Sequence, residues 1–190
     1  MKSAIAIKNL TIKYEGNTVL EDFSYNFQKG FYAITGQSGI GKTSLINAIL
    51  GLIPYTGTIS FDGEPRFSAV FQEDRLCEGL SVKKNITIVN RYSASEISTA
   101  LEEVGLEGCL NTRISELSGG MKRRIAILRA ILADYNILVL DEPFKGLDAD
   151  NKSAVMDFIQ KKTSDKTVLL ITHDLSEAEF FNCEIVNLVR

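Results

Sequence analysis

A glycine-rich segment that ends in lysine and threonine has the clearest chemical potential in this sequence. It reads GQSGIGKT and follows the apolar run 31–35. Glycines let the backbone wrap around a phosphate, and the N–H groups that open a helix favour negative charge there. Lys42 is long enough to reach β- and γ-phosphates, and the Thr43 hydroxyl is a ligand for Mg²⁺. The pattern predicts a Walker A loop for a nucleoside triphosphate, formed by Gly36, Gln37, Ser38, Gly39, Ile40, Gly41, Lys42, Thr43 and Ser44.

An ordinary glycine-rich turn is the alternative interpretation of this segment. The motif matches at every fixed position and lies between a strand-like run and a helix-like one, and this context favours the phosphate-binding interpretation.

Two adjacent carboxylates, Asp141 and Glu142, follow the apolar run 137–140. Such a run predicts a buried parallel strand, and parallel sheets bind their ligands at the carboxyl ends of the strands. Alone, this pattern is more often a solvated strand end. Downstream of a Walker A loop it predicts a Walker B strand, with Asp141 holding Mg²⁺ and Glu142 polarising the attacking water.

The hydrophobic pattern predicts the elements that position these residues. Alternation with a period of two in residues 5–27 indicates antiparallel strands. Apolar runs that alternate with helical patterns after residue 119 indicate a mostly parallel sheet covered on both faces. Between residues 74 and 116 the pattern becomes helical, with Ser93 or Ser95 as an N-cap. We therefore expect one compact domain over residues 1–190, with a small helical lobe inserted at about 74–116.

The bulk properties narrow the function further. A length of 190 residues suits one domain, and a net charge of −3 gives no electrostatic reason to expect nucleic acid. No apolar run approaches the roughly 20 residues needed to cross a bilayer, and no signal-peptide core is present. Three widely spaced cysteines are most simply free thiols in a reducing compartment. We expect a cytoplasmic protein.

The segment LSGGM at residues 117–121 identifies the family. Ser118, Gly119 and Gly120 open a predicted helix and form a second site for an anion. With this segment upstream of the Walker B strand, nearly the whole chain resembles the ATP-binding cassette (ABC) ATPases, whose signature is LSGGQ. The resemblance implies an α/β P-loop NTPase core with a mostly parallel sheet, an N-terminal antiparallel β-subdomain and an inserted small helical subdomain.

Four further positions resemble named loops of that family. Tyr14 resembles the A-loop aromatic that stacks on adenine, and Gln72 the Q-loop glutamine that senses Mg²⁺ and water. Asp148 resembles part of the D-loop, and His173 the switch histidine that contacts the γ-phosphate. The implied catalytic residues are thus Glu142, His173, Lys42 and Gln72.

Three other features complete the comparison with the family. Met121 replaces the last signature residue, and Lys145 stands where the family often has a small residue, near the expected dimer seam. The basic run 122–124 is interpreted as a solvated helix face without a nucleic-acid role.

The resemblance implies how the protein works. Two cassettes pair head to tail, and the Ser118 loop of one closes over ATP held by the Walker loop of the other. Such a subunit hydrolyses ATP, with Mg²⁺, beside transmembrane permease subunits at the cytoplasmic face of the membrane. Residues 73–76 and 141–144 resemble importer cassettes of the nitrate, sulfonate and taurine group. A soluble ABC ATPase of translation or DNA repair is the alternative. A kinase or a GTPase would leave the Ser118 loop unexplained.

Overall fold

The computed structural model describes residues 4–189. These residues form two compact units. The first contains the chain up to Phe67, Asn136–Asp141 and the chain from Asp165 onward, and the second contains Ser68–Tyr135 and Glu142–Ser164. The chain therefore alternates between the two units along its length.

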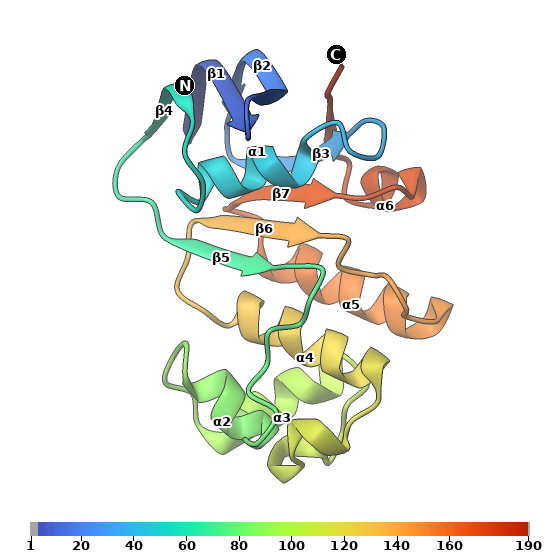
Figure 1. The fold of residues 1–190 in the computed structure, drawn as a ribbon. Coiled ribbons are helices and arrows are strands. Elements are labelled where there is room, and N and C mark those ends of the chain that lie inside the picture. Colours follow the sequence, from blue (N-terminus) through green and yellow to red (C-terminus); the bar gives the residue numbers. More distant parts are fainter. Residues whose placement is uncertain (1–3, 190) are drawn as a thin grey trace. The chain divides into compact units, whose positions relative to one another are not determined.

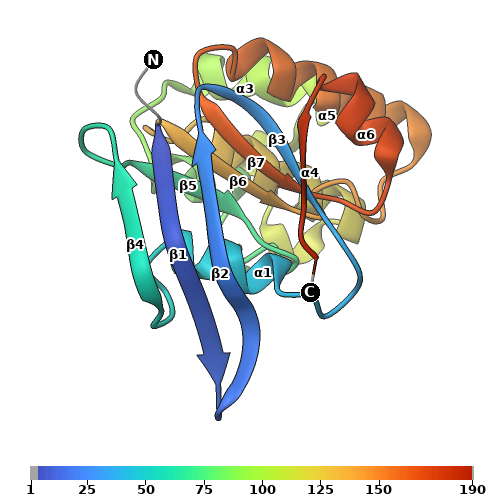
Figure 2. The ribbon, with the colours of Figure 1, turned by 90° about the horizontal axis from the view of Figure 1, so that it is seen from above.

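A three-stranded antiparallel sheet forms one layer of the first unit (Figure 2). Its strands are β1 (Ile5–Tyr14), β2 (Asn17–Phe27) and β4 (Thr56–Phe61), in the order β2-β1-β4. Tyr14 pairs with Asn17, so Glu15 and Gly16 form a two-residue turn, and both have positive φ angles. Such angles are typical of the turn that matches the twist of a hairpin. The predicted antiparallel strands are confirmed.

The second sheet of the structure is the one that bears the Walker motifs (Figure 1). It contains β3 (Gly30–Thr35), β5 (Phe67–Val70), β6 (Ile137–Asp141), β7 (Thr167–Ile171) and β8 (Glu184–Asn187), in the order β5-β6-β7-β3-β8. Every residue of β6 and β7 is buried, as the continuous apolar runs predict. The neighbours β6, β7, β3 and β8 are parallel. Helices α1 (Lys42–Ile49) and α6 (Leu175–Phe180) belong to the first unit, whereas residues 68–70 of β5 belong to the second.

Helices dominate the second unit. They are α2 (Val82–Thr87), α3 (Ala94–Glu103), α4 (Gly119–Ile131) and α5 (Ala149–Lys162), with short 3₁₀ turns at Cys109–Asn111 and Ile114–Glu116. Ser93 caps α3 through a capping box with Glu96, so the first of the two predicted caps is the one used. The helical segment predicted at about 74–116 lies within this unit, together with α4 and α5.

Within residues 4–189, no helix combines the length and the apolar character needed to cross a membrane.

Candidate nucleotide-binding site

The glycine-rich loop lies between the carboxyl end of β3 and the first residue of α1. Two of its glycines are required by the backbone. Gly36 has a φ of 138°, and a Cβ there would lie 2.8 Å from the Leu188 carbonyl oxygen. Gly41, the N-cap of α1, has a φ of 113°, and a Cβ there would lie 3.0 Å from Val19 Cγ1. The loop exposes Gln37, Ser38 and Gly39, buries Ile40 and half-buries Ser44.

Lys42 folds back over this loop. Its ammonium group donates to the Gly36 and Gln37 carbonyl oxygens, at 2.9 and 3.1 Å, and the residue is only 7% exposed. The N-cap residue of α1 is Gly41, which has no side chain to accept a hydrogen bond from the first N–H groups of the helix. The N–H groups at the start of a helix point toward its N-terminus, which here is the glycine-rich loop. A buried lysine beside a helix N-terminus is the arrangement that binds phosphate.

Thr43 and Asp141 place two oxygen ligands next to each other. The Thr43 hydroxyl donates to Asp141 Oδ2 at 3.3 Å, and the other carboxylate oxygen, Oδ1, is buried. Hydroxyl and carboxylate oxygens are hard ligands that suit Mg²⁺, which takes its remaining ligands from phosphates and water. Within residues 4–189, no group of three or more His, Cys, Asp or Glu side chains is placed to hold a metal ion.

Strand register explains why residues far apart in sequence meet at this edge. Ile34 of β3 is opposite Ile171 of β7, and Ile171 is opposite Asp141 of β6. The three strands therefore end level with one another, so the Walker loop, Asp141 and the segment after β7 lie at one edge of the sheet. His173 is in that segment and is exposed.

The backbone around His173 is fixed by its neighbours. The Thr172 hydroxyl donates to the Glu177 carboxylate at 2.5 Å and accepts from Asp174 N at 3.0 Å. Asp174 in turn caps α6 by accepting from Ser176 N at 2.9 Å. The predicted switch histidine thus stands on a short, well-anchored bend between β7 and α6.

Tyr14 occupies the tip of the β1–β2 hairpin and is 43% exposed. The same hairpin approaches the glycine-rich loop through Val19, against which Gly41 packs. An exposed aromatic ring on this hairpin is available for stacking on a base.

The second unit contains the remaining predicted residues, beginning with Glu142. This residue has a φ of 48°, which is in the left-handed region, and it opens a turn in which Lys145 N donates to the Glu142 carbonyl oxygen at 3.3 Å. A non-glycine residue in that region costs on the order of 1–3 kcal/mol and is held by its surroundings. The Glu142 carboxylate lies 3.5 Å from Lys145 Nζ, so the lysine that departs from the family pattern is paired with the predicted general base.

The prediction of a solvated helix face at residues 122–124 is wrong for two of its three residues. Arg123 and Arg124 are 5% and 8% exposed, and both guanidinium groups donate to backbone carbonyls. Arg124 joins Val104 and Gly105 to the Asn151 side chain, at 2.5 to 2.8 Å. Hydropathy alone cannot identify a buried arginine, because its burial depends on hydrogen-bond partners that come from other parts of the chain.

Gln72 is exposed in the segment that follows β5. With Asp74, Gly119, Gly120, Arg123, Lys145 and Gly146 it lines a cavity of about 270 Å³ in the second unit. The segment is anchored around it, because Arg129 donates to the Asp74 carbonyl oxygen at 3.2 Å and the Arg75 guanidinium lies 3.7 Å from the centre of the Phe71 ring.

The signature segment forms the exposed N-terminus of α4. Ser118 is the N-cap, and its hydroxyl oxygen accepts from Met121 N at 3.3 Å. Its hydroxyl hydrogen can still be donated. Since the cap uses the backbone of Met121, the replacement of glutamine at that position leaves it intact. Ser118 and Gly119 are exposed, and a Cβ at Gly119 would meet nothing within 4 Å.

Asp148 is the N-cap of α5. Its carboxylate accepts from Asn151 N at 3.0 Å and from Asn151 Nδ2 at 2.6 Å, and these bonds hold the pKa of the Asp148 carboxyl below its usual range. The nucleotide contact predicted for Asp148 stays a prediction, and the contact that the structure gives the carboxylate is the helix cap.

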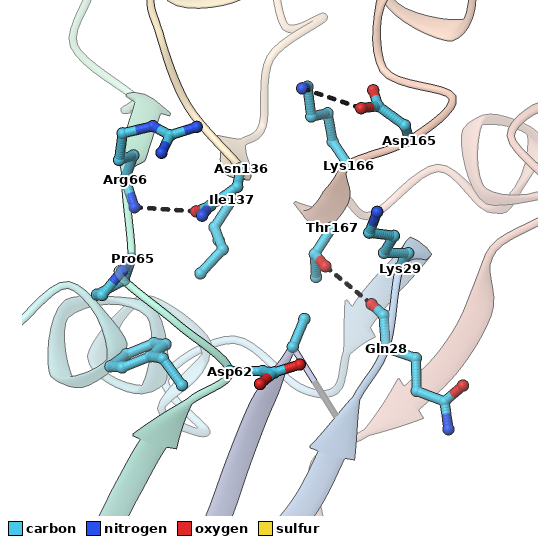
Figure 3. Close-up of a pocket in the computed structure, with 12 residues that line it drawn as sticks. Gln28, Lys29, Asp62, Pro65, Arg66, Asn136, Ile137, Asp165, Lys166 and Thr167 are labelled. Carbon is cyan, nitrogen blue, oxygen red and sulfur yellow. Dashed lines mark hydrogen bonds and ion pairs between the residues drawn. The ribbon is translucent and has the colours of Figure 1, made fainter. Parts of the chain in front are cut away.

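A larger cavity, of about 460 Å³, lies elsewhere in the first unit (Figure 3). Its lining includes Asn136, Ile137 and Thr167, at the amino ends of β6 and β7, where the Thr167 hydroxyl donates to the Gln28 carbonyl oxygen at 2.9 Å. Lys166 pairs with Asp165 at its rim. Because the Walker motifs occupy the opposite ends of these strands, this cavity is not the nucleotide site.

Known proteins resemble the chain over most of its length. Residues 20–145 match the family described as ABC transporter. The "Aliphatic sulfonates import ATP-binding protein SsuB" of Bacillus cereus is 37% identical over 185 residues, which cover 88% of this chain and 72% of the relative. The "Taurine import ATP-binding protein TauB" of Escherichia coli O157:H7 is 36% identical over 199 residues, covering 96% and 78%.

Proposed function

This chain belongs to the ABC transporter family and is its ATP-binding, ATP-hydrolysing subunit, and we propose that it powers the import of a small molecule through transmembrane permease subunits. Its place is then at the cytoplasmic face of the membrane. The relatives named for sulfonate and taurine import support an organic sulfonate as the class of cargo.

The observation that carries the proposal is the contact between Thr43 and Asp141 beside the buried Lys42. Lys42 would bind the β- and γ-phosphates, and Tyr14 would stack on the adenine. Thr43 and Asp141 would hold Mg²⁺, and Gln72 would sense the ion and water, as its resemblance to the Q-loop glutamine implies. The ion, when bound, lowers the negative charge on the phosphates. Nothing in this arrangement requires a further metal-binding cluster.

Hydrolysis in the proposed scheme uses two copies of the chain. Each Walker loop holds one ATP, and the segment Ser118–Gly120 of the other copy, with Ser118 and Gly119 exposed, closes over its γ-phosphate, with Asp148 near the seam. Glu142 accepts a hydrogen bond from the attacking water and, as general base, takes its proton. Lys42 and His173 stabilise the charge that develops on the phosphate oxygens. Closure of the pair follows ATP binding, and opening follows hydrolysis.

The proposed docking surface for the permease lies in the segment after Gln72. Asn85, which is completely buried, donates to and accepts from the backbone of Cys77, at 3.1 and 2.8 Å, and so fixes a short, largely exposed stretch at residues 76–79. Ile88, at the end of α2, is 60% exposed. A fixed surface with apolar side chains and charged neighbours suits an amphipathic helix of a membrane subunit.

Purification of the chain from detergent-solubilised membranes tests the proposal. Recovery of transmembrane proteins in a constant ratio with it, together with ATP-dependent uptake of a sulfonate by vesicles that contain the complex, is the expected result. Recovery with ribosomes or DNA-repair proteins instead, and no membrane partner, would favour the soluble ABC ATPase.

A further inference from the structure

Arg123 is buried at the start of α4 and bonds to two separate segments of the second unit. Its Nη1 donates to the Phe71 carbonyl oxygen at 2.5 Å and to Asp74 Oδ1 at 3.1 Å. Its Nη2 donates to the Glu142 carbonyl oxygen at 2.7 Å, and its Nε to the Pro143 carbonyl oxygen at 2.8 Å. One side chain therefore joins the segment around Gln72 to the turn that carries the predicted general base.

The guanidinium group is suited to this bridge for a geometric reason. It is planar and carries five N–H donors on three nitrogens, so it reaches two loops at once while its own position stays fixed. A lysine ammonium is a single point charge on a flexible stem, and it would bond to one of the two segments. The pairing with Asp74, whose side chain is 27% exposed, balances the charge of the buried guanidinium.

Glu142 is the residue whose position depends most on this bridge. Its backbone is in the left-handed region, where a non-glycine residue stays only if its surroundings hold it. The Arg123 bonds to its carbonyl oxygen and to that of Pro143 fix the peptide groups on either side of Pro143. Lys145 also pairs with the Glu142 carboxylate, and because the lysine side chain is 78% exposed this ion pair is a weak restraint.

We propose that Arg123 is a positioning residue, which holds the Glu142 turn in its catalytic geometry and ties it to the segment 71–74. The inference rests on the proposed role of Glu142 as general base. A shift of the Gln72 segment is then passed to the turn that carries Glu142, because the Phe71 carbonyl oxygen and the Glu142 backbone carbonyl oxygen are bonded to the same guanidinium. The position of Glu142 therefore depends on α4, the helix that carries Arg123.

Arg123→Lys is the variant that tests this, and Arg124→Lys is its matched control. The two arginines are adjacent in α4, are similarly buried and donate to similar sets of carbonyl and side-chain oxygens, but Arg124 bonds to neither segment. We expect Arg123→Lys to lower kcat about 10- to 100-fold, the range for a misplaced catalytic group, with the dissociation constant for ATP unchanged. Arg124→Lys should lower the melting temperature to a similar extent and leave kcat at the wild-type value.

Combining Arg123→Lys with Glu142→Gln separates positioning from a general loss of structure. If Arg123 acts through Glu142, the double variant should hydrolyse ATP, in a single-turnover assay, as slowly as Glu142→Gln alone. An equal decrease in kcat for both lysine variants would overturn the inference. So would a double variant that is slower than Glu142→Gln by the same factor by which Arg123→Lys is slower than the wild type. So would wild-type turnover by Arg123→Lys when Glu142→Gln is inactive, and in that case the role of Glu142 would stand. Wild-type turnover by Glu142→Gln itself would overturn the proposed base and this inference with it.

Discussion

Lys42 shows how a single residue is prepared for its ligand. Its ammonium group bonds to the carbonyl oxygens of Gly36 and Gln37, and these bonds restrain the side chain at the loop where the phosphates are proposed to bind. Ordering in advance lowers the entropy cost of binding phosphate.

Lys42→Ala should weaken the binding of ATP itself, since this lysine meets phosphates in the ground state as well as in the transition state. A titration with a fluorescent ATP analogue measures the change, with Lys84→Ala, in the last turn of α2, as a control for the loss of one positive charge. Unchanged affinity for the analogue in Lys42→Ala would remove the lysine from this role.

Cys77 and Cys183 should differ in reactivity because their environments differ. Burial raises the pKa of the Cys183 thiol to about 12, whereas Cys77 is exposed. At pH 8 only about one Cys183 thiol in ten thousand is ionised, and the thiolate is the reactive form.

Iodoacetamide at pH 8 should therefore alkylate Cys77 and leave Cys183 unmodified in the folded protein. Mass spectrometry of peptides measures both, and alkylation of Cys183 after unfolding in urea shows that its protection comes from the fold. Equal labelling of Cys77 and Cys183 in the folded chain would contradict the assigned burial.

The Walker motifs predicted that residues far apart in sequence would lie together. Thr43 and Asp141 are 98 positions apart and are in contact, as a Walker A and a Walker B residue should be. Prediction from sequence failed at Arg123 and Arg124, because nothing in the local pattern says that these side chains find carbonyl partners inside the protein. Lys145 departs from the family pattern in sequence, but its pairing with Glu142 becomes visible only in the folded turn that contains both residues.

Helix α4 links several of these functions. Its N-terminus presents Ser118, Gly119 and Gly120 at the surface, Arg123 bonds to the Glu142 turn one turn further along, and Arg129 bonds to the Asp74 backbone. A ligand that contacts the N-terminus of α4 therefore acts on the same helix that holds both loops.

Ser118 should act on the nucleotide of the partner copy. Mixing Lys42→Ala chains with Ser118→Arg chains produces heterodimers with one intact composite site and one doubly altered site. If the two sites work independently, the mixture should regain part of the ATPase activity that neither variant has alone. Absence of recovery in crosslinked, proven heterodimers would contradict independent sites that act in trans, and a crosslink from Ser118 to the opposite Walker loop would show whether the two sites are instead coupled.

At the scale of elements, hydrophobic periodicity and composition were sufficient to predict the type of element and the approximate position of its ends. The strand expected at 137–140 was found at Ile137–Asp141, since a continuous apolar run that long predicts a buried strand. The start of α5 at Ala149 is set by Asp148, which serves as its N-cap. Capping residues shift the ends of helices by about one or two residues, which is too small a shift for hydrophobic periodicity to reveal.

At the scale of the molecule, the proposed docking surface separates catalysis from transport. Cys77→Glu and Leu76→Glu place a charge in the stretch fixed by Asn85, away from the Walker residues in sequence. Folding and basal ATPase activity should persist, while association with the permease and transport should be lost. Co-purification with the membrane subunits and uptake by vesicles measure the two effects.

Ile185→Glu is the matched control for these variants. Ile185 is 50% exposed on β8 in the other unit, and so the change adds the same charge at an apolar surface residue. It should leave recruitment to membranes intact. If Leu76→Glu and Cys77→Glu bind the permease as well as Ile185→Glu does, the segment after Gln72 is not the docking surface.

Family membership and the importer resemblance could be predicted from short motifs, and the relatives named for sulfonate and taurine import agree with them. The division of the chain into two units could be predicted only in outline. The helical character of 74–116 was visible, but the grouping of α4 and α5 with it depends on contacts among buried side chains that are far apart in sequence.

The most direct test of the proposed mechanism is the oligomeric state of Glu142→Gln in Mg-ATP, measured by light scattering on a sizing column. The substitution keeps the shape of the side chain and removes the general base, so hydrolysis should fall about 10²- to 10⁴-fold while ATP still binds. A dimer that forms with Mg-ATP and dissociates with Mg-ADP is the predicted result. A chain that stays monomeric with bound ATP, or one that hydrolyses it at the wild-type rate, would contradict a composite site in which Glu142 activates water.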